Sequence, residues 1–175
     1  LLAPIVLIFI RRRQISKALS YVATSLGFWL VINLPFMIFN NAGWWRFFKL
    51  NSERNADFGS LWYALQLFGI HIRDLNTISI LTFLIGIAAF AVYFFGVDKT
   101  PSLAAVAFTT VAIFTLANKV YSPQYVLWLT PLAILALRDL RDRKYFWIWQ
   151  GAEIIYHLAI WENLALTAGA HFGID

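Results

Sequence analysis

Lys119 is the residue whose type and position most favour chemistry, because it ends a long apolar run beside several polar side chains. It follows Asn118 and precedes the stretch Tyr121-Ser122-Pro123-Gln124-Tyr125. An ammonium, an amide and two phenols that meet where a helix begins would hold a phosphate group, helped by the free N–H groups and the dipole of that helix. The same position suits a lysine that keeps its stem in lipid and its ammonium among headgroups. Position alone leaves both interpretations open.

A second polar group lies between Ser52 and Tyr63, where Arg54 and Asp57 are three residues apart. An arginine can bind a phosphate or a carboxylate through two parallel hydrogen bonds, so this pair is a candidate for the mouth of a binding cavity. The alternative is a solvated loop in which Ser60 or Asp57 caps the following helix.

The last apolar segment contains ionisable residues at a spacing that places them together. Glu153 and His157 are four residues apart and share one face of a helix, with Gln150 and Glu162 nearby. Ionisable groups inside a membrane usually face protein or water, so we expect Glu153 and His157 to face the bundle interior. They would serve there as a functional pair or as a structural hydrogen bond between helices. One His and one Glu lack a third ligand, so no metal site is expected.

The chain as a whole is too apolar for a water-soluble domain. Of its 175 residues, 61% are hydrophobic and 13% are charged, whereas soluble domains average about 45–50% and about 25%. The eight Trp, Trp44, Trp45, Trp147 and Trp149 among them, suit helix ends in headgroup belts. The net charge of +5 comes from basic residues at helix ends, so we interpret it as membrane topology and expect no nucleic acid as partner. The chain has no cysteine, no glycine-rich phosphate loop, no serine elbow and no HExxH motif, and no cofactor is expected.

The hydrophobic pattern predicts an all-α, polytopic transmembrane helix bundle with about five membrane segments. Residues 1–10 are expected to be the end of a helix from a longer chain, since a crossing needs about 20 residues. The other segments are predicted at 18–39, 75–96, 102–117, 124–137 and 145–166. Pro35 is expected to kink or end its helix. External loops are predicted at 40–74, with a short interfacial helix from Ser60 to Gly69, and at 118–125, while 138–144 forms a solvated loop.

The stretch NKVYSPQYVLWLTP, residues 118–131, resembles a motif in the C-terminal half of GT-C glycosyltransferases. These are multi-helix membrane enzymes that use polyprenyl-phosphate sugars. The resemblance is greatest to actinobacterial membrane proteins of glycosyltransferase family 87, and a similar pattern occurs in the catalytic mannosyltransferase I of GPI-anchor synthesis. The loop SERNADFGSLWYAL and the Trp-Gln-Gly-Ala-Glu stretch of the last segment also look like the bacterial group.

The resemblance implies transfer of a hexose, with mannose as the first candidate, from a polyprenyl-phosphate donor on the non-cytoplasmic face of a bacterial plasma membrane. The partners would be membrane lipids and the polyprenyl-phosphate sugar. The catalytic carboxylate of such enzymes usually lies in the first large external loop, which this chain would not contain. By motif position, the substrate contacts would come from Lys119, Tyr121, Ser122, Gln124 and Tyr125, with Arg54 and Asp57 as further candidates.

Two other functions stay open at this point. A transporter or lipid flippase would use Glu153 and His157 as a proton relay and Lys119 as a counter-ion for its substrate, and broken helices suit such proteins. Transporters often have paired halves, and the sequence has no internal repeat. The third possibility is a non-catalytic subunit of a membrane assembly.

The distribution of basic residues predicts the orientation of the chain. If the segments alternate, one side holds five, in 40–74 and 118–125, and the other holds nine: Arg11, Arg12, Arg13, Lys17, Lys99, Arg138, Arg141, Arg143 and Lys144. The more basic side faces the cytoplasm. Because the chain has no cysteine, single cysteines at Asn55 and Arg141 can be tested with an impermeant thiol reagent on intact cells. Labelling is expected at 55 and not at 141; the reverse pattern would exclude this orientation.

Overall fold

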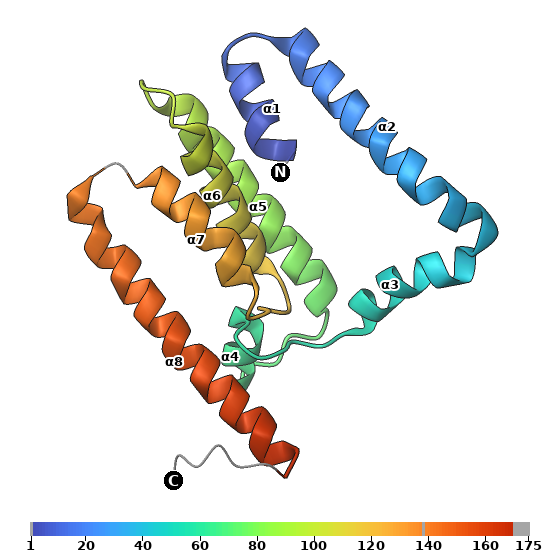
Figure 1. The fold of residues 1–175 in the computed structure, drawn as a ribbon, viewed down its shortest axis with the longest axis vertical. Helices are drawn as coiled ribbons and strands as arrows, with labels where there is room; N and C mark the ends of the chain where they lie inside the picture. Colours follow the sequence, from blue (N-terminus) through green and yellow to red (C-terminus); the bar gives the residue numbers. More distant parts are fainter. Residues whose placement is uncertain (1, 138, 170–175) are drawn as a thin grey trace.

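The computed structural model of the chain describes residues 2–137 and 139–169, and all regular structure within them is helical (Figure 1). The prediction of an all-α fold is therefore confirmed. The eight α-helices of these residues are α1 (Leu2–Arg11), α2 (Ile15–Phe39), α3 (Asn41–Glu53), α4 (Leu61–Leu67), α5 (Leu75–Gly96), α6 (Leu103–Ala117), α7 (Tyr125–Ala136) and α8 (Arg143–Thr167). A short 3-10 helix, η1 (Leu140–Asp142), leads into α8.

Helix α6 is the centre of the packing. It lies against α1, α5 and α7, and its buried residues are Val106, Ala107, Thr110, Thr115 and Ala117. These small side chains let neighbouring helices approach closely. Helix α2 lies apart from this group in Figure 1, where it packs on α1 at one end and on α3 at the other.

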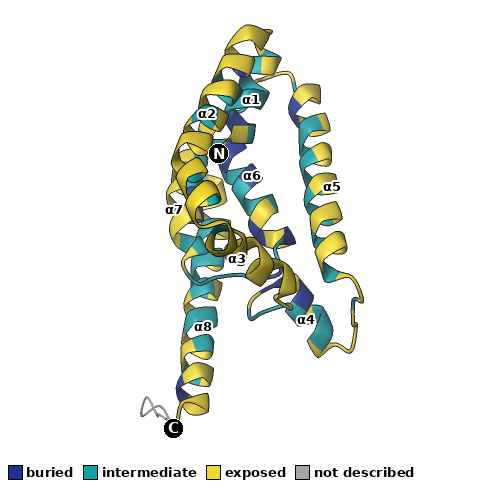
Figure 2. Ribbon diagram, turned by 90° about the vertical axis from the view of Figure 1, so that its right-hand side faces the viewer, coloured by how far each residue is buried: buried dark blue, intermediate teal, exposed yellow. Residues whose placement is uncertain are grey.

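Many large apolar residues of the outer helices are exposed, as the yellow parts of the ribbon show (Figure 2). On α2, Phe28, Val31 and Phe39 are 69%, 71% and 88% exposed. Monomeric soluble proteins rarely expose a continuous apolar patch beyond a few hundred Å². By length and composition, α2 and α5 are able to cross a membrane. Two long apolar helices of this kind favour association with a membrane.

The prediction of about five membrane segments goes further than this result. Among the described helices, only α2 and α5 combine the required length and hydropathy, whereas α1, α6 and α7 are apolar but have 10, 15 and 12 residues. A 15-residue helix spans about 22 Å, less than the roughly 30 Å of the hydrocarbon core. Helix α8 has 25 residues but carries Glu153, His157 and Glu162. The number of crossings stays a prediction.

The interval 40–74, predicted as an external loop with one short helix, contains a second helix. Helix α3 begins after Asn40, whose side chain accepts a hydrogen bond from the N–H of Gly43 at 3.0 Å. Trp44 packs edge-on against Trp29 of α2 and donates to Asn33 at 3.0 Å, which sets the angle between α2 and α3. The prediction missed α3 because charged and aromatic residues are mixed along it, so it lacks a continuous apolar stretch. Helix α4 lies within the predicted short helix.

Two predicted boundaries also differ from the structure. Helix α2 continues through Pro35 to Phe39, so the proline does not end it; a proline removes one backbone N–H, here the donor to Val31 four residues back. The predicted solvated loop at 138–144 is shorter than expected, because η1 and the start of α8 occupy 140–144. Arg138 lies outside the described residues.

The pair α1 and α2 is attached to the bundle by Arg11. Its guanidinium donates hydrogen bonds to the backbone carbonyls of Phe94, Val97 and Asp98. These carbonyls lie at the C-terminal end of α5, where helix carbonyls lack intrahelical partners and the dipole is negative. The guanidinium also lies 5.2 Å from the centre of the Phe94 ring. Arg11 is therefore a tertiary cap of α5.

We expect Arg11→Met to lower the free energy of unfolding by about 2–3 kcal/mol, because the aliphatic stem is kept while the carbonyls lose a charged donor. The control is Arg12→Met, which changes an exposed neighbour and is expected to alter stability by about 0.5 kcal/mol or less. Denaturant unfolding of both variants in the same detergent measures the difference. Equal midpoints for the two variants would contradict the capping role.

Candidate functional site

The loop that joins α6 to α7, residues 118–124, lies between two segments far from it in sequence. On one side is the loop before α4, where the N–H of Asp57 donates to the carbonyl of Lys119 at 2.9 Å. On the other side is α8, whose Tyr156 hydroxyl donates to the carbonyl of Tyr121 at 2.9 Å. Tyr156 also lies 3.2 Å from the carbonyl of Phe58. One tyrosine of α8 thus joins both loops.

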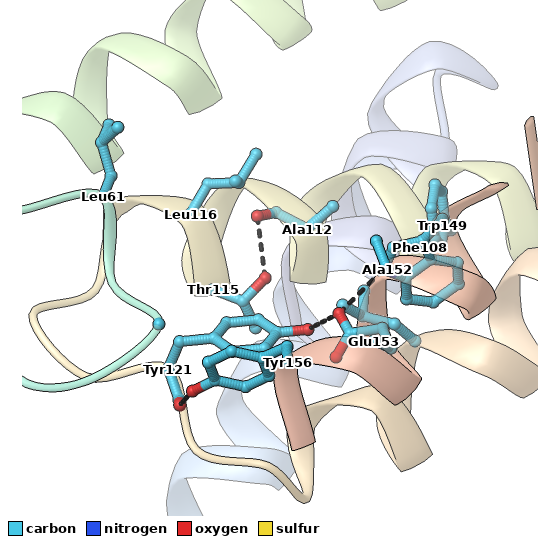
Figure 3. Close-up of a pocket in the computed structure, with 12 residues that line it drawn as sticks. Leu61, Phe108, Ala112, Thr115, Leu116, Tyr121, Trp149, Ala152, Glu153 and Tyr156 are labelled. Atoms are coloured by element: carbon cyan, nitrogen blue, oxygen red, sulfur yellow. Dashed lines mark hydrogen bonds between the residues drawn. The ribbon is translucent and has the colours of Figure 1, made fainter. Parts of the chain in front are cut away.

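These segments enclose a cavity of about 420 Å³ (Figure 3). Its walls come from α6, α8, the start of α4 and single residues of α7 and the loops. Most of the lining is apolar, and its polar side chains are Tyr121, Glu153, Tyr156 and Thr115, whose hydroxyl donates to the carbonyl of Ala112 at 3.0 Å. The full lining is Gly59, Leu61, Phe108, Ala112, Thr115, Leu116, Tyr121, Leu129, Trp149, Ala152, Glu153 and Tyr156.

Lys119 is buried beside this cavity, with 8% of its surface exposed. Its ammonium donates to the carbonyls of Asn51 and Arg54 at 2.8 Å each, to that of Ser52 at 3.3 Å, and to the side chain of Asn76. The three carbonyls belong to the C-terminal end of α3 and its cap, where a cation is favoured. Lys119 is therefore a tertiary cap of α3.

The sequence did not predict this capping contact. A snorkelling anchor would be more exposed than Lys119 is. An ammonium has three N–H donors, and at Lys119 they are directed at protein oxygens. Burial, and to a smaller extent the charge of Arg54, lower the pKa of Lys119, while its oxygen partners favour the charged form. Direct contact with a phosphate stays a prediction and would require the ammonium to leave some of these oxygens.

Glu153 is the carboxylate of the cavity wall, and its side chain is 11% exposed. Its Oε1 accepts hydrogen bonds from the Tyr121 hydroxyl at 2.5 Å and from the Trp149 indole at 2.9 Å. Figure 3 shows Tyr121 pointing from the loop toward Glu153. Burial, followed by the hydrogen bond to Glu153, raises the pKa of Tyr121 above its ordinary value, so this phenol is a donor at neutral pH. The other carboxylate oxygen, Oε2, is buried without a hydrogen-bond partner among the described residues.

His157 lies one turn further along α8 and is 27% exposed. Its Nδ1 is 2.6 Å from the carbonyl oxygen of Glu153, and its Nε2 is 3.0 Å from the carbonyl oxygen of Pro123. Glu153 and His157 thus both contact the loop at 118–124. Nearby on the same helix, Gln150 donates to Thr130 of α7 at 3.2 Å.

The loop before α4 is held by short local contacts. Arg54 and Asp57 form an ion pair with 2.5 Å between Nη2 and Oδ2. Ser60 caps α4 by accepting from the N–H of Tyr63 at 3.1 Å, one of the two expected caps. Gly59 has a φ of +71°, and a Cβ there would overlap the Tyr156 ring, so this turn requires glycine.

The other candidate residues of the motif lie at the start of α7. The Ser122 carbonyl accepts from the N–H of Tyr125 at 2.9 Å, and Gln124 is exposed. The Tyr125 ring packs 5.8 Å from that of Tyr121 and 4.8 Å from that of Trp128. Gln124 and Tyr125 therefore lie beside the cavity-lining Tyr121 without lining the cavity.

Several site residues were not found from the sequence. Trp149 was interpreted as part of an interface belt, yet it lines the cavity and bonds to Glu153; a signal existed, since 149, 153 and 156 follow the i, i+4, i+7 spacing of one helix face. Trp62 is buried and donates to the carbonyl of Ala117 at 2.9 Å. No sequence pattern predicted this contact. His71 is exposed, and His171 lies outside the described residues.

The described part of the chain contains no cluster of three His, Asp or Glu side chains arranged to hold a metal ion. Comparisons of the chain with protein families, with curated proteins and with solved structures find no match.

We expect Lys119→Met to destabilise the protein by about 2–4 kcal/mol, because the carbonyls at the end of α3 lose their charged donor. Lys119→Arg is expected to restore only part of this, since a planar guanidinium does not reproduce a compact cluster of donors. The control is Lys49→Met on α3, where the lysine is exposed and forms a single 3.8 Å ion pair with Glu53. Thermal unfolding in detergent measures all three, and a Lys119→Met variant as stable as the control would exclude the capping role.

Proposed function

We propose that this chain is part of an integral membrane glycosyltransferase of the GT-C type. The enzyme transfers a hexose, with mannose as the first candidate, from a polyprenyl-phosphate donor on the non-cytoplasmic face. In this proposal the helices α2, α5, α8 and the packed group α1, α6 and α7 form the membrane-embedded bundle. Lys119, Tyr121 and Gln124 lie at its external end, as the count of basic residues predicts.

One observation supports this proposal most directly: the three stretches that resemble GT-C enzymes meet at one cavity. Tyr121 comes from the first motif, Gly59 and Leu61 come from the second, and Trp149 with Glu153 comes from the third. They are separated by tens of residues, and the hydrogen bonds of Tyr156 join two of them directly. Convergence of separate segments on one concave, largely apolar pocket with a few polar groups is typical of a ligand site.

The chemistry of the cavity suits an amphipathic ligand with an apolar chain and a polar head. Phe108, Ala112 and Leu116 offer an apolar wall, which an isoprenoid chain can cover. On the polar side, Tyr121 donates to Glu153 and packs against Tyr125 at the start of α7, the residue that follows Gln124. We propose that the phosphate approaches Gln124 and Tyr125, with Ser122 beside them. Lys119 then stabilises this loop indirectly, through its hydrogen bonds to the carbonyls at the end of α3.

A second candidate function has one observation in its favour. The unpartnered Oε2 of Glu153 lies 3.8 Å from Nδ1 of His157, and a buried carboxylate beside a histidine is an arrangement that proton-coupled transporters use. This alternative makes Glu153 essential for transport with no sugar transfer at all. Assay of the two activities in the same preparation separates the proposals.

The cavity is tested by filling it in the full-length enzyme that contains this chain. Ala112→Trp puts a large ring into the cavity and is expected to lower mannose transfer from a polyprenyl-phosphate donor by about 10- to 100-fold. The control is Leu135→Trp on the exposed face of α7, which is expected to leave transfer unchanged. Thermal midpoints and expression levels of both variants report folding. Normal transfer in a folded Ala112→Trp enzyme would exclude the cavity as the donor site.

The same assay tests the polar residues. Gln124→Ala and Tyr125→Phe are expected to raise KM for the lipid donor, whereas Lys119→Ala and Lys119→Arg are both expected to lose transfer together with stability. Near-normal transfer in Lys119→Ala would contradict a donor site at this loop. Proton-coupled uptake by vesicles that contain the wild-type protein, in the absence of sugar transfer, would favour the transporter instead.

A further inference from the structure

Helix α3 divides its side chains into an aromatic side and a charged side. With about 3.6 residues per turn, its aromatic residues share one half of the helix surface and its charged residues share the opposite half. The aromatic side is formed by Trp44, Trp45, Phe47 and Phe48, and the charged side by Arg46, Lys49 and Glu53. Leu50 lies at the border between the two sides. A helix divided in this way suits the boundary between an apolar and an aqueous environment.

The aromatic side of α3 is directed back along the body of α2. Trp44 donates to Asn33 at 3.0 Å, and its ring centre lies 6.4 Å from that of Trp29. Trp29 lies about 15 Å before the end of α2, at 1.5 Å per residue. Phe48 packs on Trp44 with 4.8 Å between ring centres. The aromatic residues therefore lie on the side of α3 that faces along α2, and the charged residues lie on the side that faces beyond its end.

Helix α3 also runs crosswise to α2 and α5, the two described helices that are long and apolar enough to cross a membrane (Figure 1, Figure 2). When α2 crosses a bilayer, α3 therefore lies along the plane of its surface. The aromatic side is open: Trp45 and Phe47 are 54% and 67% exposed. The adjoining end of α2 has exposed apolar residues as well, at Phe36 and Phe39. The aromatic side of α3 thus adjoins the surface that α2 offers to lipid.

We propose that α3 is an interfacial helix whose aromatic side binds the lipids of the bilayer leaflet at the α3 end of α2. Aromatic rings bury apolar area at the depth of the headgroups, while basic residues on the opposite side stay in water near the lipid phosphates. Lys49 and Glu53 fit the aqueous side, since both are exposed and form an ion pair at 3.8 Å. The occupant is bilayer lipid because α2 places the aromatic side toward the membrane.

The position of α3 extends to the cavity through Lys119. The Lys119 ammonium donates to the carbonyls of Asn51 and Arg54 at the C-terminal end of α3, at 2.8 Å each. The loop at 118–124 is therefore held at the level of the headgroups, together with Tyr121, which lines the cavity. This inference rests on α3 and its contacts and is independent of the transferase proposal.

Nitroxide labels at Phe48→Cys and Arg46→Cys, introduced one at a time, test the proposal in the protein reconstituted in phosphatidylcholine nanodiscs. The 175 residues contain no cysteine, and both positions are exposed. Electron paramagnetic resonance measures how often each label meets oxygen, which concentrates in lipid, and a water-soluble nickel chelate. We expect the label at position 48 to lie about 5–10 Å inside the headgroup boundary and to meet oxygen more often than nickel. The label at position 46 is expected to show the opposite order.

Two other outcomes would overturn the proposal. Frequent contact of nickel with both labels would mean that water covers the aromatic side, and low access of both reagents to position 48 would mean that protein covers it. Thermal midpoints of the labelled variants report folding. If Phe48→Cys does not fold, the pair Phe47→Cys and Glu53→Cys compares the same two sides of α3 while the packing of Phe48 on Trp44 is kept. The same order of access, oxygen at 47 and nickel at 53, is expected.

Discussion

A buried ammonium needs oxygen partners for all of its N–H groups, and this requirement at Lys119 connects most of the elements at one end of the molecule. The Lys119 side chain binds the end of α3 and, through Asn76, the start of α5. The backbone carbonyl of the same residue accepts from Asp57 in the loop before α4. Among the described residues, the main contacts of helix α2 are with α1 and α3, so its placement also depends on where Lys119 holds α3.

The opposite end of the bundle uses the same principle with a different cation. Arg11 caps α5 as Lys119 caps α3, and each side chain reaches across to a helix distant in sequence. Helix ends carry unpaired carbonyls that a nonpolar environment cannot satisfy, so a long cationic side chain from another element is an effective partner. Basic residues that a topology count treats as markers of membrane sides therefore also determine which helices pack together.

Polar side chains near the Lys119 end of the bundle form part of the cavity wall. Tyr121 and Trp149 both donate to Oε1 of Glu153, so the carboxylate shapes the cavity wall while most of the lining is apolar. An apolar lining of this kind suits the lipid part of the proposed polyprenyl donor better than it suits a free sugar.

The sequence by itself determined the helical class, the limits of α5 and α6, and the shared face of Glu153 and His157, and it limited the cap of α4 to Ser60 or Asp57. These follow from hydrophobic runs, helix periodicity and local hydrogen bonds, which act over a few residues. The same reasoning missed α3, whose aromatic and charged residues form no continuous apolar stretch. Only the tertiary structure decided what Lys119 binds, that Trp149 lines a cavity, and that Tyr156 reaches Phe58, 98 residues away. Such contacts depend on how whole helices pack, and a long polar side chain gives no sign in the sequence of which distant carbonyls will surround it.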